Sequence, residues 1–218
     1  MWQLLPFVDD PVARSSFRNI FGYTLAAFGA FTDAQRLLAE QLDDVERYRL
    51  DFVRPYALIN QALMLSGLRD YSEAEAALDE ADARALRSGD QTAYHIAWAV
   101  RTRLYVAQAA FDRALNHAIS PVAGITPSLR AEIIACSAVA LAAVGESERA
   151  LAYAAEAARA SGAVEVAITV PCVMAIVDIR ARAYDGALVH ARRALDHAHR
   201  SKMIEALVAV YRGCPELL

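Results

Sequence analysis

Apolar side chains recur at intervals of three and four residues along most of this chain, which is the pattern of amphipathic helices. Near the N-terminus these apolar positions are Phe17, Ile20, Phe21, Leu25 and Phe28. The polar residues Arg18, Asn19 and Thr24 lie between them. The spacing predicts a helix with one buried face, and similar segments follow it to the end of the chain.

A short motif accompanies these helices. It consists of an aromatic or small residue, two spacers and an alanine, with further small or apolar residues four and seven positions later. The alanines are separated by 40, 40, 36 and 37 residues, and they are Ala34, Ala74, Ala114, Ala150 and Ala187. A period of this length, filled with helical patterns, is typical of stacked helix pairs. The sequence therefore predicts an all-α, right-handed superhelical solenoid of antiparallel helix pairs, with about 11 helices in one domain over residues 1–218.

Capping and turn signals divide the chain into repeats. Asp10-Pro11 and Thr126-Pro127 are typical helix starts, because Asp and Thr cap helix N-termini and proline is tolerated in the first turn. Asp90 is predicted to cap the fifth helix, and residues 120–127 form the clearest break. The predicted repeats cover about residues 11–47, 52–88, 90–119, 127–160 and 163–199, followed by a terminal helix over 202–212.

One segment allows two interpretations. Residues 164–179 are rich in β-branched side chains and contain Pro171, so by themselves they resemble a strand. Their position in the repeat favours a helix that is kinked at the proline. We therefore predict a helix here.

Composition and charge exclude several classes of protein. Of the 218 residues, 56% are hydrophobic and 22% are charged, so the chain is not of the disordered type. The net charge is −4 and no basic stripe stands out, which argues against direct nucleic-acid binding. The uncharged apolar runs at 133–145 and 166–177 are well short of the roughly 20 residues that span a bilayer. Early charges at Asp9, Asp10 and Arg14 interrupt any signal-peptide core, so we expect a cytoplasmic protein without a membrane partner.

The residue patterns of common catalytic and metal sites are missing. The only lysine, Lys202, lies outside any P-loop motif. His190 and His197 share a helix face but lie about 10 Å apart by helical rise, too far for one metal ion. The three cysteines are expected to be small core residues in a reducing compartment: Cys136, Cys172 and Cys214. We therefore expect no cofactor, no metal and no enzymatic activity.

Asp178 is unusual because, counted back from the alanine motif, it falls at a position that is normally apolar and inward-facing. Arg182 follows one helical turn later. The spacing predicts an ion pair between the two side chains.

Function is expected on the side lined by the first helix of each pair, which forms the concave groove of such solenoids. Tyr56 and Asn60 share one face of a first helix, and Arg54 stands at its start. Arg103 faces the same side in the next pair, with Arg101 beside it. These residue types are suited to recognising an acidic or polar small molecule, or a peptide. The alternative is that all five form hydrogen bonds between repeats.

The packing pattern resembles tetratricopeptide repeats, although the period here is longer than in that family. The residues close to the consensus are Phe21-Gly22, Gly29, Phe31, Ala34 and Leu38. Further motifs resemble the helical-repeat region of large LuxR-type transcriptional regulators. In chain order they are Asp10-Pro11-Val-Ala-Arg14-Ser-Ser-Phe17, the segment from Glu46 to Leu58, Gly67-Leu68-Arg69 with Tyr71, and the closing segment from Ala206 to Leu218.

Regulators of that family combine an N-terminal P-loop ATPase module, a superhelix of helix pairs and a C-terminal helix-turn-helix. MalT-like members use the superhelix to bind an inducer and to control oligomerisation. The resemblance covers only the superhelix, so it implies the middle part of such a regulator or a truncated relative. It implies a non-catalytic sensor or protein-interaction domain that binds a small-molecule effector or a protein partner in its groove, with flanking ATPase and helix-turn-helix domains in the full-length protein.

Two further expectations remain open at this point. The apolar ends of the chain, at Phe7, Val8 and Leu217-Leu218, are expected to favour a homodimer. The residues also permit a free-standing, tetratricopeptide-like scaffold that binds peptides and is unrelated to transcription.

Overall fold

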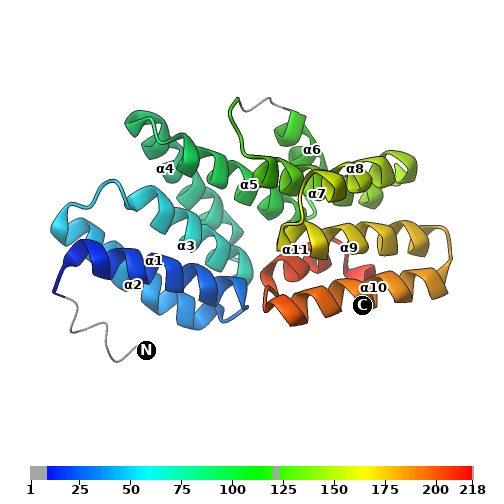
Figure 1. Cartoon of the computed structure of the whole chain (residues 1–218), viewed down its shortest axis with the longest axis horizontal. Coiled ribbons are helices and arrows are strands. Elements are labelled where there is room, and N and C mark those ends of the chain that lie inside the picture. The colour runs from blue at the N-terminus through cyan, green and yellow to red at the C-terminus, as the bar shows by residue number, and fades with distance from the viewer. Residues whose placement is uncertain (1–8, 120–122, 218) are drawn as a thin grey trace. The chain divides into compact units, whose positions relative to one another are not determined.

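The computed structural model describes residues 9–119 and 123–217, and within these ranges its regular elements are helices, with no strand (Figure 1). The structure confirms the predicted all-α class. The helices are α1 (Pro11–Ala27), α2 (Phe31–Tyr48), α3 (Arg54–Leu68), α4 (Tyr71–Ser88), α5 (Gln91–Ala107), α6 (Phe111–Ile119), α7 (Pro127–Ala143), α8 (Ser147–Ala160), α9 (Val164–Arg180), α10 (Tyr184–Ser201) and α11 (Glu205–Gly213), followed by the 3-10 turn η2 (Pro215–Leu217).

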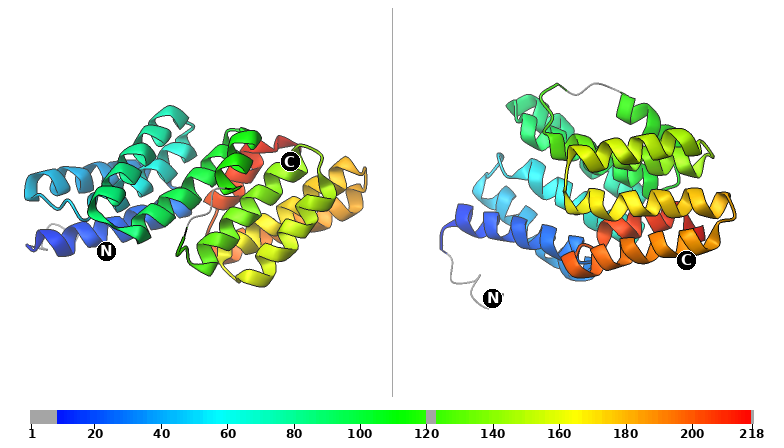
Figure 2. Two further views of the ribbon diagram at one scale, coloured as in Figure 1. Left: turned by 90° about the horizontal axis from the view of Figure 1, so that it is seen from above. Right: turned by 45° about the vertical axis from the view of Figure 1, so that its right-hand side comes forward.

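The chain divides into two compact units, Met1–Ala97 and Trp98–Leu218, and the boundary falls inside the continuous helix α5. In the first unit α1 packs on α2 and α3 packs on α4, while α3 also contacts both helices of the preceding pair. In the second unit α7 packs on α8 and α9 packs on α10, and α9 again contacts the preceding pair (Figure 2). Each unit is thus a stack of helix pairs, as the repeat predicts. The single domain and the right-handed superhelix stay predictions.

Three predicted N-caps are present. The Asp10 carboxylate accepts a hydrogen bond from the Val12 amide at 3.0 Å, and Asp90 accepts one from the Ala93 amide at 3.0 Å. The Thr126 hydroxyl accepts one from the Leu129 amide at 3.4 Å. Each oxygen satisfies an amide that has no partner inside its helix. Of the predicted break after α6, residues 120–122 lie outside the described part of the chain.

The segment that resembled a strand is helical. α9 covers Val164–Arg180 and includes Pro171, which is buried. Its β-branched side chains Val166, Ile168 and Ile176 are buried against neighbouring helices. Burial on several sides outweighs the weak β-preference of these residues, because strand propensity largely reflects the packing environment. The kink at Pro171 stays a prediction.

The alanines of the repeated motif lie in the interior of the two stacks. All five are buried: Ala34, Ala74, Ala114, Ala150 and Ala187. The aromatic residue that opens the motif adds a second contact, because the ring of Phe31 lies on Gly67 of α3. A Cβ added at Gly67 would lie 2.5 Å from Cζ of Phe31, well inside van der Waals contact. Small residues at these positions let the helices approach closely.

Two expectations about single residues need correction. The carboxylate of Asp178 lies 3.7 Å from Nε2 of His190, and Arg182 is not its partner. Arg182 adopts a left-handed backbone conformation (φ 61°) after the end of α9, so it leaves the helical spacing on which the prediction relied. Leu217 packs against the core of the second unit and does not form an open apolar end. Phe7, Val8 and Leu218 lie outside the described residues.

Candidate functional site

The first unit holds three of the predicted groove residues, beginning with Arg54 at the start of α3. Its Nη1 donates to Glu46 of α2 at 2.6 Å, and its Nε donates to Glu80 of α4 at 3.1 Å. Burial by itself lowers the pKa of Arg54, but the two carboxylates outweigh this effect and raise the pKa above its ordinary value. Arg54 therefore connects α3 to helices on both sides of it.

Tyr56 lies two residues further along the first turn of the same helix. Its hydroxyl donates to Oδ1 of Asp90 at 3.2 Å, the oxygen that also caps α5 through Ala93. Burial, and secondly the neighbouring Asp90, raise the pKa of Tyr56 to about 12. The phenol thus stays protonated and holds the N-cap of α5.

Asn60 belongs to a buried hydrogen-bond network. Its Nδ2 donates to the backbone oxygen of Asn19 at 3.0 Å and to Oδ1 of Asn19 at 2.9 Å. Gln41 of α2 donates to the same Oδ1 at 3.3 Å, so Asn19 of α1 joins helices of two pairs. For Arg54, Tyr56 and Asn60 the structure therefore supplies the contacts between repeats that the sequence left as an alternative.

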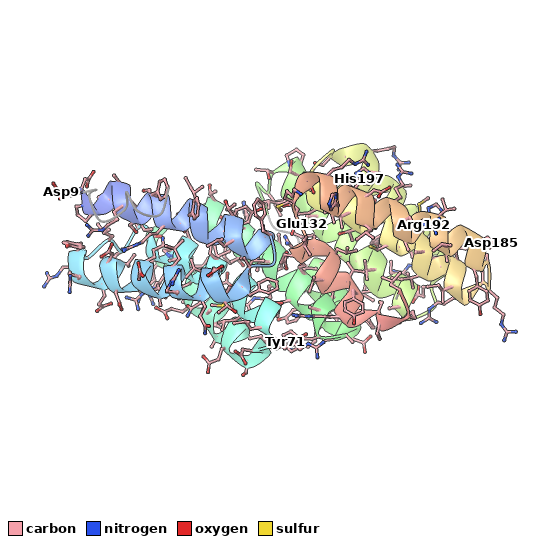
Figure 3. All side chains as sticks on the ribbon, turned by 90° about the horizontal axis from the view of Figure 1, so that it is seen from below. Asp9, Tyr71, Glu132, Asp185, Arg192 and His197 are labelled. Atoms are coloured by element: carbon pink, nitrogen blue, oxygen red, sulfur yellow. The ribbon has the colours of Figure 1, made fainter. Side chains whose placement is uncertain are left out.

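Arg103 is the centre of a buried ionic cluster in the second unit. Its Nη2 donates to Glu132 of α7, labelled in Figure 3, and its Nη1 donates to Glu205 of α11. At most a tenth of each of the three side chains is exposed: 9% for Arg103, 10% for Glu132 and 5% for Glu205. Within the described residues, Nε of Arg103 has no hydrogen-bond partner. One guanidinium thus joins three helices that are far apart in the sequence.

The single guanidinium of Arg103 is surrounded by several carboxyl groups. Burial lowers the pKa of Arg103, but Glu132, Glu205 and the nearby Glu165 outweigh it and raise that pKa well above its ordinary value. Burial raises the pKa of Glu132 above 4.5, and the attraction of Arg103 opposes this only in part. The arrangement is chemically suited to hold a carboxylate, because the guanidinium presents several donors in one plane.

α11 covers the first-helix side of the second unit, where the groove was predicted. Its buried positions include Ala206, Ala209, Val210 and Gly213, and Cys214 after it is buried too. We call the surface under it the α11 seat. It consists of Arg103 and Val106 of α5 and of the α9 face that carries Cys172, Val173 and Ile176, which share one core cluster with Val210 and Cys214.

The closest approach in the seat is at Gly213. A Cβ added there would overlap the carbonyl oxygen of Val106 and lie 3.1 Å from its carbonyl carbon. Because that neighbour is backbone, it cannot turn away as a side chain can. Glycine therefore lets the end of α11 lie directly against α5.

Arg101, the last of the predicted groove residues, is also buried on α5.

His117 packs against the same helix. The indole of Trp98 in α5 stacks on the His117 ring with centroids 3.8 Å apart. Burial, and to a smaller extent the charge of Arg101, lower the pKa of His117 to about 4, although its contact with the Trp98 carbonyl works against this. His117 is therefore neutral at pH 7.

Sequence reasoning missed Glu132 and Glu205. A signal for Glu132 was present, because it is the only acidic residue of α7 and directly precedes the long uncharged run of that helix. A buried carboxylate needs a cation, and Arg103 was already a candidate. Nothing local marks Glu205, which reads as an ordinary acidic residue in the first turn of a helix.

Other kinds of site receive no support from the described residues. Among them, no group of three His, Cys, Asp or Glu side chains is arranged to hold a metal ion, and no helix is both long and apolar enough to cross a bilayer. The three cysteines are buried, free thiols, and burial raises the pKa of each to about 12. Comparison of the chain with models of protein families, with curated proteins and with solved structures gives no match.

Proposed function

We propose that this chain is a non-catalytic sensor or protein-interaction domain of a LuxR-type transcriptional regulator. It binds an effector or a partner on the side lined by the first helices of its pairs. The observation that carries the proposal is that this side, in the second unit, presents a buried arginine to a carboxylate carried by a separate helix. The ordered motifs that resemble the repeat region of those regulators supply the context.

The mechanism we propose is a shift between populations. An occupant that contacts the α5 and α9 surfaces favours one arrangement of the stacked pairs over another. Its differential affinity for the two arrangements limits how far it can move the equilibrium. In a regulator, such a shift would control self-association or the activity of flanking ATPase and helix-turn-helix domains.

The first test is the reading frame around the coding segment. An in-frame P-loop sequence on its 5′ side and a helix-turn-helix sequence on its 3′ side would support the regulator. A frame that encodes neither would refute it. For the full-length protein, an effector that binds the folded state should raise the melting temperature by mass action, with a dependence on effector concentration that gives its affinity.

A second candidate is a tetratricopeptide-like scaffold for peptides or helices that is unrelated to transcription. One observation favours it: the first-helix side of the second unit holds a helix, and the polar residues named there contact other protein side chains. The reading frame separates the two candidates, because a scaffold requires neither flanking domain.

A further inference from the structure

α11 is bound to the second unit in the way that a separate helical ligand would be. Its acidic first residue, Glu205, reaches Arg103, and small or apolar positions one, four, five and eight residues later are buried: Ala206, Ala209, Val210 and Gly213. The pattern is an acid followed by small residues along one helix face. Small residues at such an interface permit close backbone approach, as Gly213 does against Val106.

Two features make this helix exchangeable. α11 has nine residues, and isolated helices shorter than about 12–15 residues are marginal in water, so it is ordered only while it is docked. When it leaves, Arg103 keeps Glu132 as its partner, so no unpaired charge stays behind in the seat. A buried cation whose only partner left with the helix would oppose release far more strongly.

We propose that the α11 seat is a binding site for an amphipathic helix of another protein, and that α11 is its built-in competitor. The partner helix carries a glutamate or aspartate in its first turn and small residues one, four and eight positions later, and it binds in place of α11. This inference rests on the proposed function, whose site it specifies. The tether gives α11 an effective concentration in the millimolar range, so a partner binds only when its affinity overcomes that competition.

The chain contains a reporter of α11 release. Cys214 directly follows α11 and is 1% exposed, while Cys136 and Cys172 lie in the core of the same unit. Labelling with a thiol reagent under native conditions, mapped by mass spectrometry, therefore separates opening of α11 from opening of the whole unit. Opening of α11 modifies Cys214 and uncovers Cys172 in the seat, whereas Cys136 of α7 is modified only when the whole unit opens.

The variant Gly213→Ala should release α11, because the added methyl group overlaps the Val106 carbonyl. The matched control is Gly162→Ala, where an added Cβ meets nothing within 4 Å. We expect Cys214 of G213A to label at least about tenfold faster than in the parent chain, with Cys136 unchanged, since only the local opening equilibrium shifts. G162A should label like the parent.

The binding test uses a fluorescent peptide of residues 203–217 under reducing conditions. The peptide should bind the 218-residue chain with Gly213→Ala at least about tenfold more tightly than it binds the parent chain, whose own α11 competes for the seat. The same peptide with Glu205→Lys should bind G213A at least about tenfold more weakly, because it places a second cation against Arg103.

The proposal is overturned if Cys136 of G213A labels as fast as Cys214, or if the peptide binds both chains equally. Equal binding of the glutamate and lysine peptides overturns it as well. If G213A forms a dimer by size-exclusion chromatography, the occupant is a second copy of this chain, and the assignment to a different protein is wrong. These readouts need no effector and no flanking domain, so they fail or succeed independently of the reading-frame test.

Discussion

Replacing Arg103 by methionine tests the energetic role of the ionic cluster. Methionine keeps much of the apolar stem but leaves Glu132 and Glu205 buried without a counter-charge. Removing one partner of a buried ion pair costs about 3–5 kcal/mol, and here one guanidinium serves two carboxylates. We expect the free energy of unfolding of the second unit to fall by about 4–5 kcal/mol, a large share of the roughly 5–15 kcal/mol that holds a typical domain together.

Urea unfolding followed by tryptophan fluorescence measures this loss. The variant Trp2→Phe leaves Trp98, in the second unit, as the only tryptophan and serves as the parent. Arg149→Met is the matched control, because its partner Glu146 and the arginine itself are exposed, and such surface pairs contribute little. The triple variant Arg103→Met, Glu132→Gln, Glu205→Gln should regain most of the lost stability, since no charge is then left buried.

The pH dependence adds a second criterion. Burial raises the pKa of Glu132 in the folded chain. The stabilising free energy that follows from this shift is fully present below pH 4.5 and is lost as the pH rises through the folded pKa. Without Arg103 that rise becomes larger, and the deficit of R103M should therefore shrink between pH 7.5 and pH 5. The reasoning is refuted if R103M loses no more stability than R149M. It is also refuted if the triple variant stays as unstable as R103M, because the loss would then come from packing of the arginine stem.

Three further outcomes are expected. Gly67→Ala should destabilise the first unit by about 1–3 kcal/mol, measured by urea unfolding with circular dichroism, because the added methyl group overlaps the Phe31 ring. Adding Phe31→Leu should restore part of the lost stability, and full additivity of the two changes would contradict the contact. Tyr56→Phe should cost about 0.5–1.5 kcal/mol by losing the hydrogen bond to Asp90. Since the pKa of Tyr56 is raised to about 12, its contribution is present below pH 10 and lost as pH rises through 12, so the parent should lose stability more steeply than Y56F in that window; parallel curves would argue against it. In NMR titrations His117 should stay neutral down to about pH 4. The stability that the neutral ring contributes is present above pH 6.5 and should be lost as the pH falls through 4, and His117→Phe should remove this acid-side loss of stability. Titration of His117 near pH 6.5 would show that the ring is not buried against Trp98.

Local sequence signals were sufficient to predict the helices and the residues at which they begin. Asp10, Asp90 and Thr126 cap the helices that they were predicted to cap, because capping depends on residues within one turn. The motif alanines marked buried positions for a similar reason, since their spacing reflects one face of each helix. Asp178 shows where local spacing stops being informative: the left-handed backbone at Arg182 ends the helical register, and the contact passes to His190 on the next helix.

The candidate site could be predicted only in part. Arg103 was identified because arginine on a first-helix face is a recognisable pattern, whereas its partners lie 29 and 102 residues away along the chain. No periodic signal encodes a contact over such a separation. Likewise, the sequence predicted a terminal helix over 202–212 as an addition to the stack, and only the structure places α11 against both α5 and α9.

The sequence by itself determined the helical class, the helix-pair repeat and most helix boundaries, because these follow from side-chain periodicity and from capping within a few residues. Tertiary structure alone decided which polar side chains pair with one another. It joined Asn60 to Asn19, Tyr56 to Asp90 and Arg103 to two carboxylates. The physical reason is that a buried polar group must find a partner wherever packing brings one within reach, and packing depends on all the helices of a unit together.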